Sequence, residues 1–343
     1  MGLRRFEVDV AAPFRLDLAV WALRRRPHNA VDGWDGTTWR RTVVTGSGPA
    51  ELAVRQEQGP AGPRLLAELR RSGPPPGAST TAEAARLVEK ILGLRADLSG
   101  FYALAGGDPR LAPLAHRFAG MRPPRFPTVF EALVNAVACQ QLSLTVGIHL
   151  LNRLASRYGA APVRPGGEPA FPAPAQLAGA DQQGLRELGF SGSKARTIIL
   201  LARRSDDGAD LDDLEQLGDD EVRAELLALP GIGRWSAEYT MLRGLGRWHV
   251  LPGDDVGARN NLRRRFGLAG DGGYDAIAEL SQAWWPYGGL VYFHLLLDSL
   301  AGSGAIGGDG LGGDGPSGDG PSGDADPSAG PATNAAPHHK EVA

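Results

Sequence analysis

A glycine-containing turn is the first segment whose composition suggests a chemical role. Residues 229–234 read LPGIGR, and Gly231 and Gly233 separate one helical pattern from the next. Glycine lets the backbone approach a partner closely, and the first N–H groups of a helix have no partner within it. Those donors and the helix dipole suit a phosphate oxygen, and Ser236 adds a further donor. A plain turn between two helices has the same pattern, so the turn alone leaves both interpretations open.

A pair of aspartates is the second such segment. Residues 251–256 read LPGDDV, and Asp255 follows Gly233 by 22 residues. Aspartates that precede a helical stretch are typical N-caps. A helix N-terminus also keeps a carboxylate ionised, and a fixed carboxylate that faces a developing positive charge is a means of electrostatic catalysis. The residues themselves leave both interpretations open.

Helices must position these two segments, because the chain from about residue 126 onward consists of helical patterns joined by short Gly/Pro turns. Phe130, Leu133 and Val137 share one helical face, and Thr128 precedes them as an N-cap. Further helical stretches follow as far as about residue 300. This part of the chain is predicted to be mostly α-helical.

The residues before this helical part have a different pattern. Apolar residues alternate over 6–10 and 14–20, which predicts strands, and a hairpin is expected around Asp35-Gly36. Leu52 and Val54 indicate another short strand, and the spacing over 87–92 predicts a helix. We therefore expect an N-terminal α+β domain over 1–118 and an all-α domain over 119–300.

The C-terminal segment 301–343 is rich in Gly, Asp, Pro and Ser and has almost no apolar residues, so we expect it to be disordered. The whole chain of 343 residues has a net charge of −3, and 301–343 carry five Asp and one Glu against Lys340. Residues 1–300 are therefore slightly basic, which is compatible with nucleic-acid binding.

Composition excludes several classes of protein. The single cysteine, Cys139, rules out a disulfide framework, a Cys-ligated zinc site and a four-Cys iron–sulfur cluster. The N-terminus has no apolar stretch typical of a secretory signal, and the most apolar run, 290–297, is too short to span a bilayer. We expect a cytoplasmic protein with no membrane partner.

Four segments in order resemble the helix-hairpin-helix DNA glycosylase superfamily, and within it the 3-methyladenine DNA glycosylase II (AlkA) type. They are FEALVNAVACQQLS, LGFSGSKARTIILLA, LPGIGRWSAEYTMLRG, and LPGDDV leading to WWPYGGLVYFHLLL. The resemblance covers roughly 126–300. It implies a mainly α protein with the helix-hairpin-helix glycosylase fold, preceded by an antiparallel-sheet N-terminal domain.

The resemblance also implies a reaction. Such enzymes flip a damaged nucleotide out of double-stranded DNA and hydrolyse its N-glycosidic bond, here that of an alkylated purine such as 3-methyladenine. Asp255 matches the catalytic aspartate that stabilises an oxocarbenium-like sugar, orients water, or does both. Asp254 is the alternative if the match is shifted by one residue.

The hairpin would hold DNA. In the superfamily its backbone donors bind phosphate, and a monovalent cation, Na⁺ or K⁺, often binds its main-chain carbonyls. The matching DNA-binding residues are Gly231, Gly233, Arg234 and Ser236, and the matching carbonyls belong to Leu227, Leu229 and Ile232. No other cofactor is expected, and an iron–sulfur cluster is excluded.

Two further sites follow from the resemblance. Gln141 matches the residue that fills the gap left by the flipped base, whereas Gln140 is better explained as a polar residue at a helix end. The residues expected to line the base pocket are Trp235, Tyr239, Trp285 and Tyr287. The superfamily's tryptophan on the last helix is Leu296 here, which leaves the lesion preference open.

The resemblance leaves three functions to distinguish. Superfamily members that also nick DNA carry a lysine just after the hairpin, where this sequence has Trp235, and the nearest lysine in sequence is Lys194. We therefore expect a monofunctional, monomeric glycosylase without AP lyase activity. The alternatives are the same fold acting on deaminated or oxidised purines, and a non-catalytic module that binds damaged DNA.

Overall fold

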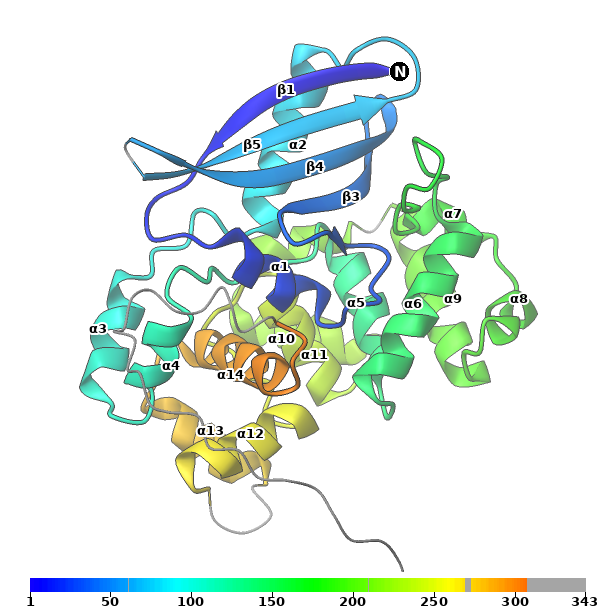
Figure 1. The fold of residues 1–343 in the computed structure, drawn as a ribbon. Helices are drawn as coiled ribbons and strands as arrows, with labels where there is room; N and C mark the ends of the chain where they lie inside the picture. The colour runs from blue at the N-terminus through cyan, green and yellow to red at the C-terminus, as the bar shows by residue number, and fades with distance from the viewer. Residues whose placement is uncertain (61, 209, 269–272, 307–343) are drawn as a thin grey trace, which may run out of the picture. The chain divides into compact units, whose positions relative to one another are not determined.

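The N-terminal part of the chain forms a five-stranded antiparallel sheet (Figure 1). The computed structural model describes residues 1–60, 62–208, 210–268 and 273–306. The sheet has the order β1-β5-β4-β3-β2. Its strands are β1 (Gly2–Asp9), β2 (Gly33–Trp34), β3 (Thr38–Thr45), β4 (Gly48–Gly59) and β5 (Gly62–Arg71).

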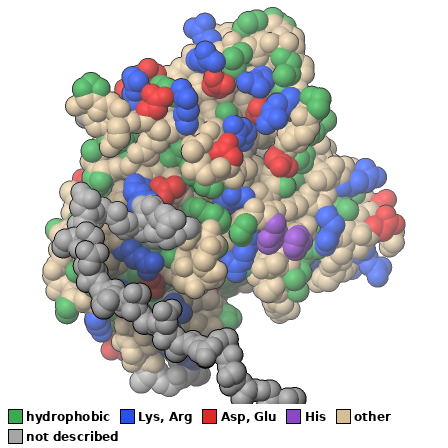
Figure 2. Space-filling model, viewed as in Figure 1, with side chains coloured by type: hydrophobic (Ala, Val, Ile, Leu, Met, Phe, Trp, Pro, Cys, Tyr) green, Lys and Arg blue, Asp and Glu red, His purple; other side chains and the backbone are tan. Residues whose placement is uncertain are grey.

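One face of the sheet is apolar because the register places its buried residues opposite one another. Leu52 pairs with Leu69, and Val54 pairs with Ala67. This face packs against two helices, α1 (Leu16–Arg24) and α2 (Ala78–Ile91), and α2 covers the back of the sheet in the view of Figure 1. On the face shown in Figure 2, the basic side chains over the sheet are interspersed with acidic ones.

Helix α1 contradicts one prediction. The apolar alternation over 14–20 predicts a strand, and that prediction is wrong. Eight of the nine residues of α1 are buried, from Leu16 to Arg24. A helix that is buried all round is apolar at every spacing, so an alternating pattern arises in it by chance.

Other predictions for the N-terminal region are confirmed. The hairpin around Asp35-Gly36 is confirmed, since Trp34 pairs with Trp39. Leu52 and Val54 lie in β4, and residues 87–91 lie in α2. Strand β5 is an additional element for which the sequence provides no clear signal.

The rest of the chain is helical, which confirms the predicted fold class. Thr128 is the N-cap of α5, and its side chain accepts the amide of Glu131, as predicted. The helices are α3 (Ser99–Gly107), α4 (Ala112–Arg117), α5 (Val129–Cys139), α6 (Leu144–Tyr158), α7 (Pro174–Ala178), α8 (Gln182–Glu187), α9 (Gly192–Asp206), the 3₁₀ helix η1 (Leu211–Gln216), α10 (Asp219–Ala228), α11 (Arg234–Arg243), α12 (Val256–Phe266), α13 (Tyr274–Gln282) and α14 (Gly288–Gly302).

The helices enclose two cores. Helices α5, α6, α9, α10 and α11 share one core, and α3, α4, α12, α13 and α14 share the other. Helix α5 also contacts the sheet's core through Ala132 and Ala136. Residues 99–117 precede the all-α region in sequence, yet they pack on α14 rather than on the sheet.

A buried ion pair joins the sheet to α5. Arg41 of β3 donates to Glu131 of α5 at 2.6 Å and to Asp32 at 2.9 Å. All three side chains are almost completely buried. Removing one member would leave an uncompensated buried charge, so this cluster specifies how the sheet and α5 pack.

The folded part of the chain continues beyond residue 300, where the sequence predicts its end. Helix α14 continues to Gly302, and Ile306 is only 5% exposed and belongs to the second core. The expectation of disorder is therefore wrong for 301–306, because an apolar side chain there has a core to enter. Residues 307–343 lie outside the described residues. None of the described helices has the length and apolarity that a membrane span requires.

Candidate active site

A cleft of about 1030 Å³ brings together most of the residues singled out in the sequence. Its walls come from the end of α1, the end of α5 with the loop into α6, the start of α9, the turn before α11 with α11 itself, the start of α12, and α14. The two segments with chemical potential, 229–234 and 251–256, therefore lie on one cavity.

Asp255 is held in the cleft by three neutral donors. Its Oδ1 accepts the amide of Ala258 at 2.8 Å, as expected of the N-cap of α12. Its Oδ2 accepts the indole Nε1–H of Trp235 and the hydroxyl of Tyr292, each at 3.2 Å. Burial and the Asp255 charge raise the pKa of Tyr292 well above its usual value, so this phenol stays a donor. Asp255 is thus both a helix cap and an oriented carboxylate.

Asp254 has a different environment. Arg234 donates to both of its carboxylate oxygens, at 2.7 and 3.1 Å. The same guanidinium lies 3.7 Å from the centroid of the Tyr274 ring. This bidentate pair compensates the charge of Asp254, whereas no cation is among the three donors to Asp255.

Glu238 holds the loop that carries both aspartates. Its carboxylate accepts the amide of Gly253 at 3.1 Å and the hydroxyl of Tyr274 at 2.6 Å. Burial raises the pKa of Glu238. A Cβ at Gly253 would come within 2.8 Å of the Tyr274 ring, so the loop needs glycine there. Residues 251–255, called the aspartate loop below, are thereby fixed to α11.

The hairpin between α10 and α11 is tightly packed. Gly231 has a φ of +81°, and a Cβ there would collide with the side chain of Thr197. Gly233 is the N-cap of α11, with open space where a side chain would be. Because no side chain covers Gly233, the first backbone N–H groups of α11 can donate hydrogen bonds to a bound ligand.

Gln140 connects the end of α5 to this hairpin. Its Nε2 donates to the carbonyl of Gly231 at 3.0 Å and to the hydroxyl oxygen of Ser236 at 2.8 Å. Ser236 lines the cleft but is nearly buried. Gln140 therefore links the end of α5 to the hairpin and to the start of α11.

Lys194 holds the other side of the loop after α5. Its Nζ donates to the carbonyls of Ala138 and Gln140, at 3.1 and 2.6 Å. Burial lowers the pKa of Lys194. Gln141, which follows Gln140, is exposed and has a left-handed backbone with φ of +53°. Gln141 therefore projects from a loop that is fixed on both sides.

The predicted aromatic residues separate into two groups. Trp235 and Tyr239 line the cleft, with ring centroids 5.3 Å apart. The structure does not bring Trp285 and Tyr287 there. Trp285 is 62% exposed and lies against His249, and Tyr287 packs on Phe101 in the second core. Both precede α14, and the cleft-lining residues of this part of the chain lie on α14 itself.

Leu296, Tyr292, Arg25 and Lys194 also line the cleft, although none of them was predicted as a site residue. Leu296 lies in the cleft, where the resemblance implies a tryptophan. Tyr292, one helical turn before Leu296, shares its face, and this spacing was the available signal. Arg25 and Lys194 also line the cleft, and nothing local in the sequence marks Arg25, since distant packing brings it there.

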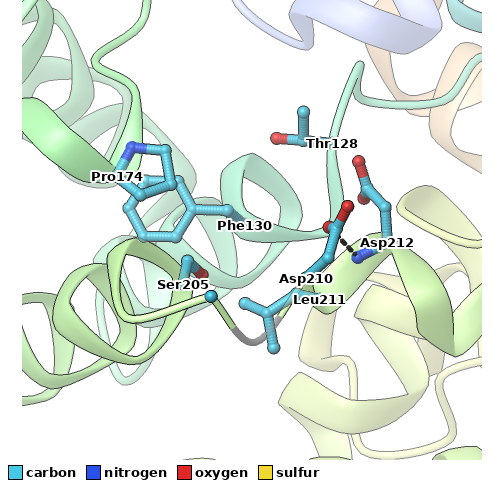
Figure 3. A pocket seen from close by; sticks show the side chains of 8 residues that line it. Thr128, Phe130, Pro174, Ser205, Asp210, Leu211 and Asp212 are labelled. Atoms are coloured by element: carbon cyan, nitrogen blue, oxygen red, sulfur yellow. Dashed lines mark hydrogen bonds between the residues drawn. The ribbon is translucent and has the colours of Figure 1, made fainter.

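A second, smaller hollow of about 290 Å³ lies beside the start of α5 (Figure 3). Its aspartates cap backbone: Asp212 accepts the amide of Val129 at 2.7 Å, and Asp210 accepts the amide of Asp212 at 2.9 Å. No Lys or Arg is among its described lining residues. Within the described part of the chain, no group of three or more His, Cys, Asp or Glu is placed to hold a metal ion. The larger cleft is therefore the candidate site.

Comparison with known proteins finds similarity to DNA repair proteins. Residues 134–287 match the model of the HhH-GPD superfamily base excision DNA repair proteins. The chain is 27% identical over 293 residues to a putative DNA-3-methyladenine glycosylase, YfjP, of Bacillus subtilis, which covers 85% of this chain and 97% of the relative. It is 34% identical over 181 residues to DNA-3-methyladenine glycosylase 2 of Escherichia coli, covering 51% of this chain and 60% of the relative.

A solved structure extends the likeness to the sheet. The 3-methyladenine DNA-glycosylase from Archaeoglobus fulgidus superposes with a TM-score of 0.73 at 25% identity, covering 86% of this chain and 97% of that one. The resemblance seen in the four segments is thus confirmed. The match to the model of HhH-GPD superfamily base excision DNA repair proteins, residues 134–287, contains the hairpin, Asp255 and most of the cleft.

Proposed function

We propose that this protein is a monofunctional DNA glycosylase that releases alkylated purines from double-stranded DNA. The observation that carries the proposal is Asp255, a carboxylate oriented by three neutral donors on a large cleft next to the hairpin. The relatives named as 3-methyladenine glycosylases supply the substrate class.

The reaction follows from the charge of Asp255. A damaged nucleotide flips into the cleft, its N-glycosidic bond breaks, and positive charge develops on the sugar. Asp255 stabilises that charge and orients the water that adds to C1′. The base leaves with the bonding electrons, and the water's proton passes to Asp255 or to the departing base. Trp235 supplies an aromatic face for the flipped base.

DNA would lie across the hairpin and the loop after α5. The first amides of α11, together with Arg234 and Ser236, are the donors for a phosphate. Gln141 would enter the gap in the duplex, and the anchoring of its loop by Gln140 and Lys194 suits that task. Unstacking a base pair is costly, so a rigid loop is an advantage.

A monovalent cation at the hairpin is part of the proposal. The carbonyls of Leu227, Leu229 and Ile232 are neutral oxygen donors, which suit Na⁺ or K⁺. Leu227 lies in the last turn of α10, where carbonyls lack intrahelical partners, and the Leu229 carbonyl accepts only the Ile232 amide at 3.1 Å among the described backbone contacts. When bound, the ion would screen a DNA phosphate.

A panel of duplex oligonucleotides, each with one lesion, tests the proposal. We expect abasic sites to form with alkylated purines and not with undamaged DNA. Release of only deaminated or oxidised purines would favour the second function, for which Leu296 in the cleft is the supporting observation. Tight binding without release would favour a non-catalytic module. Gel filtration with and without DNA tests the proposed monomer.

A further inference from the structure

A pair of stacked histidines lies near the loop that carries Gln141. The rings of His28 and His149 have centroids 4.1 Å apart and planes inclined by only 15°. His28 follows the end of α1, and His149 lies in the second turn of α6. The Nε2 of His28 is 3.4 Å from the carbonyl oxygen of Thr145, in the first turn of α6. Two titratable side chains are therefore held together outside the catalytic arrangement.

The segment that carries His28 is fixed on α6. The side chain of Asn152 donates to the carbonyl of His28 at 2.6 Å and accepts the amide of Ala30 at 3.0 Å. Arg26 lines the cleft, and its Nε donates to the hydroxyl of Thr145 at 3.2 Å. The side chains brought together in this way are called the histidine patch below; they are Arg26, His28, Thr145 and His149.

The histidine patch is electropositive. The chain has no Asp or Glu over residues 132–167, which include all of α6, and Arg153 lies one helical turn beyond His149. Partial burial, together with the charges of His149, Arg26 and Arg24, lowers the pKa of His28. The neighbouring charges that act most strongly on His28 are thus all positive. Such a surface attracts a phosphate backbone.

The loop after α5 connects the hairpin with the histidine patch. Gln140, at the start of the loop, contacts the carbonyl of Gly231 in the hairpin at 3.0 Å. Thr145, just beyond the end of the loop, contacts Arg26. Gln141 lies between these two contacts in the chain. Because a duplex extends on both sides of an inserted side chain, one flank can meet the hairpin while the other meets the histidine patch.

We propose that the histidine patch binds the DNA backbone on the flank of Gln141 away from the hairpin, and that it takes up protons from solution as it binds. The inference rests on the proposed function, since it requires duplex DNA at the cleft. Two stacked imidazolium rings repel each other, and a phosphate beside them offsets that repulsion. DNA therefore favours the protonated rings, so binding must tighten as pH falls from about 8 to about 6. At higher pH the rings are neutral with and without DNA, and the effect is absent.

The test measures the affinity of the full chain for a duplex with one tetrahydrofuran abasic analogue, by fluorescence anisotropy at constant ionic strength. From about pH 8 to about pH 6, wild-type binding should tighten about fivefold or more. His28→Gln combined with His149→Gln should reduce this change to about twofold or less, since carboxylates and phosphodiesters stay ionised over the range. His116→Gln removes an exposed histidine of α4 and is the matched control, with wild-type behaviour expected. His149→Arg should tighten binding at about pH 8, because arginine keeps its charge there.

Two results would overturn the inference. One is a double variant that keeps the pH dependence of the wild type, and the other is a wild-type affinity that does not change with pH. If the double variant does not fold, His149→Gln alone decides, because this side chain is exposed, and an unchanged pH dependence refutes the proposal. Failure of the proposed function has a different signature, which is a wild type that binds the duplex but releases no damaged base. A wild type that binds no duplex would overturn both.

Discussion

At the scale of single residues, two adjacent aspartates have opposite surroundings. The spacing from the hairpin and the position before a helix suffice to predict that one of the pair matters. The match to the superfamily favours Asp255 over Asp254, and the structure shows how the two differ: Arg234 compensates Asp254, and neutral donors orient Asp255. Arg25 was beyond prediction, because the contacts that bring it to Tyr239 join residues 214 positions apart.

The first prediction concerns these aspartates. Asp255→Asn should lower the single-turnover rate of base release by about 100-fold or more, because the amide cannot balance the charge on the sugar. Affinity for duplex DNA, measured by fluorescence anisotropy, should be retained, since removing a negative charge does not weaken attraction to phosphate. Asp254→Asn is the matched control and should be milder. Near-wild-type release by Asp255→Asn, or the reverse order, would contradict the assignment.

The second prediction separates hydrolysis from strand cleavage. The resemblance matches Trp235 to the lyase lysine, and tryptophan cannot form a Schiff base; the Nζ of Lys194 is held by two carbonyls. We expect a free base and an intact abasic strand that breaks only after alkali or heat. Borohydride should trap no enzyme–DNA adduct. Trapping at the level of a known lyase would refute this, and its loss in Lys194→Met would identify the nucleophile.

At the scale of elements, caps and turns were predictable because their signals are local. Thr128 before α5 and Asp35-Gly36 between β2 and β3 both act through neighbours within a few residues. Helix α1 was predicted wrongly because its burial, which comes from the sheet and from α14, overrides the pattern. Trp285 and Tyr287 were misplaced for the same reason, since the orientation of α14 decides which aromatic side chains enter the cleft.

The third prediction concerns the attachment of the aspartate loop to α11. Glu238→Ala removes the acceptor for the Gly253 amide and the Tyr274 hydroxyl. We expect an unfolding free energy lower by about 1–3 kcal/mol and a kcat lower by about tenfold, with KM little changed, because the loop positions Asp255 rather than binds DNA. Glu238→Gln should recover part of the rate, and the exposed Glu225→Ala is the control. Equal effects of Gln and Ala on kcat would argue against positioning.

At the scale of the whole molecule, the N-terminal region contributes to the cleft as well as to stability. The turn after α1 supplies Arg25, and the buried Arg41–Glu131 pair holds β3 on α5. Helices α3 and α4 precede residues 134–287, which match the family model, but pack on α14. Such packing joins distant segments, so composition and periodicity could not reveal it.

The fourth prediction concerns the C-terminus. Residues 307–343 are acidic and poor in apolar residues, so a chain ending at residue 306 should keep the melting temperature and base-release rate of the full chain. A chain ending at Leu300 also loses Ile306 from the core, and burial of such a side chain contributes about 1.5–3 kcal/mol. Its melting temperature should therefore be lower. Equal melting of the two truncated chains would show that Ile306 adds nothing.

The last prediction concerns how stability depends on pH, through His294 in α14. Burial lowers the pKa of His294 to about 4, and its Nδ1–H donates to the Leu290 carbonyl at 2.8 Å, so the folded protein holds a neutral ring. The unfolded chain binds a proton near pH 6.5, so the stabilisation is complete above that pH and is lost as pH falls toward 4.

His294→Phe is the variant that isolates this effect, since the ring packs against Phe101 at 4.8 Å and Phe118 at 6.3 Å. Between pH 7.5 and 4.5, urea denaturation of the wild type should show about 2–3 kcal/mol more loss of unfolding free energy than the variant shows. Carboxylates titrate equally in both proteins, so the difference reports His294 alone. If the unfolding free energies of the two proteins fall equally with pH, the pKa of His294 is not lowered by folding, and the prediction is wrong.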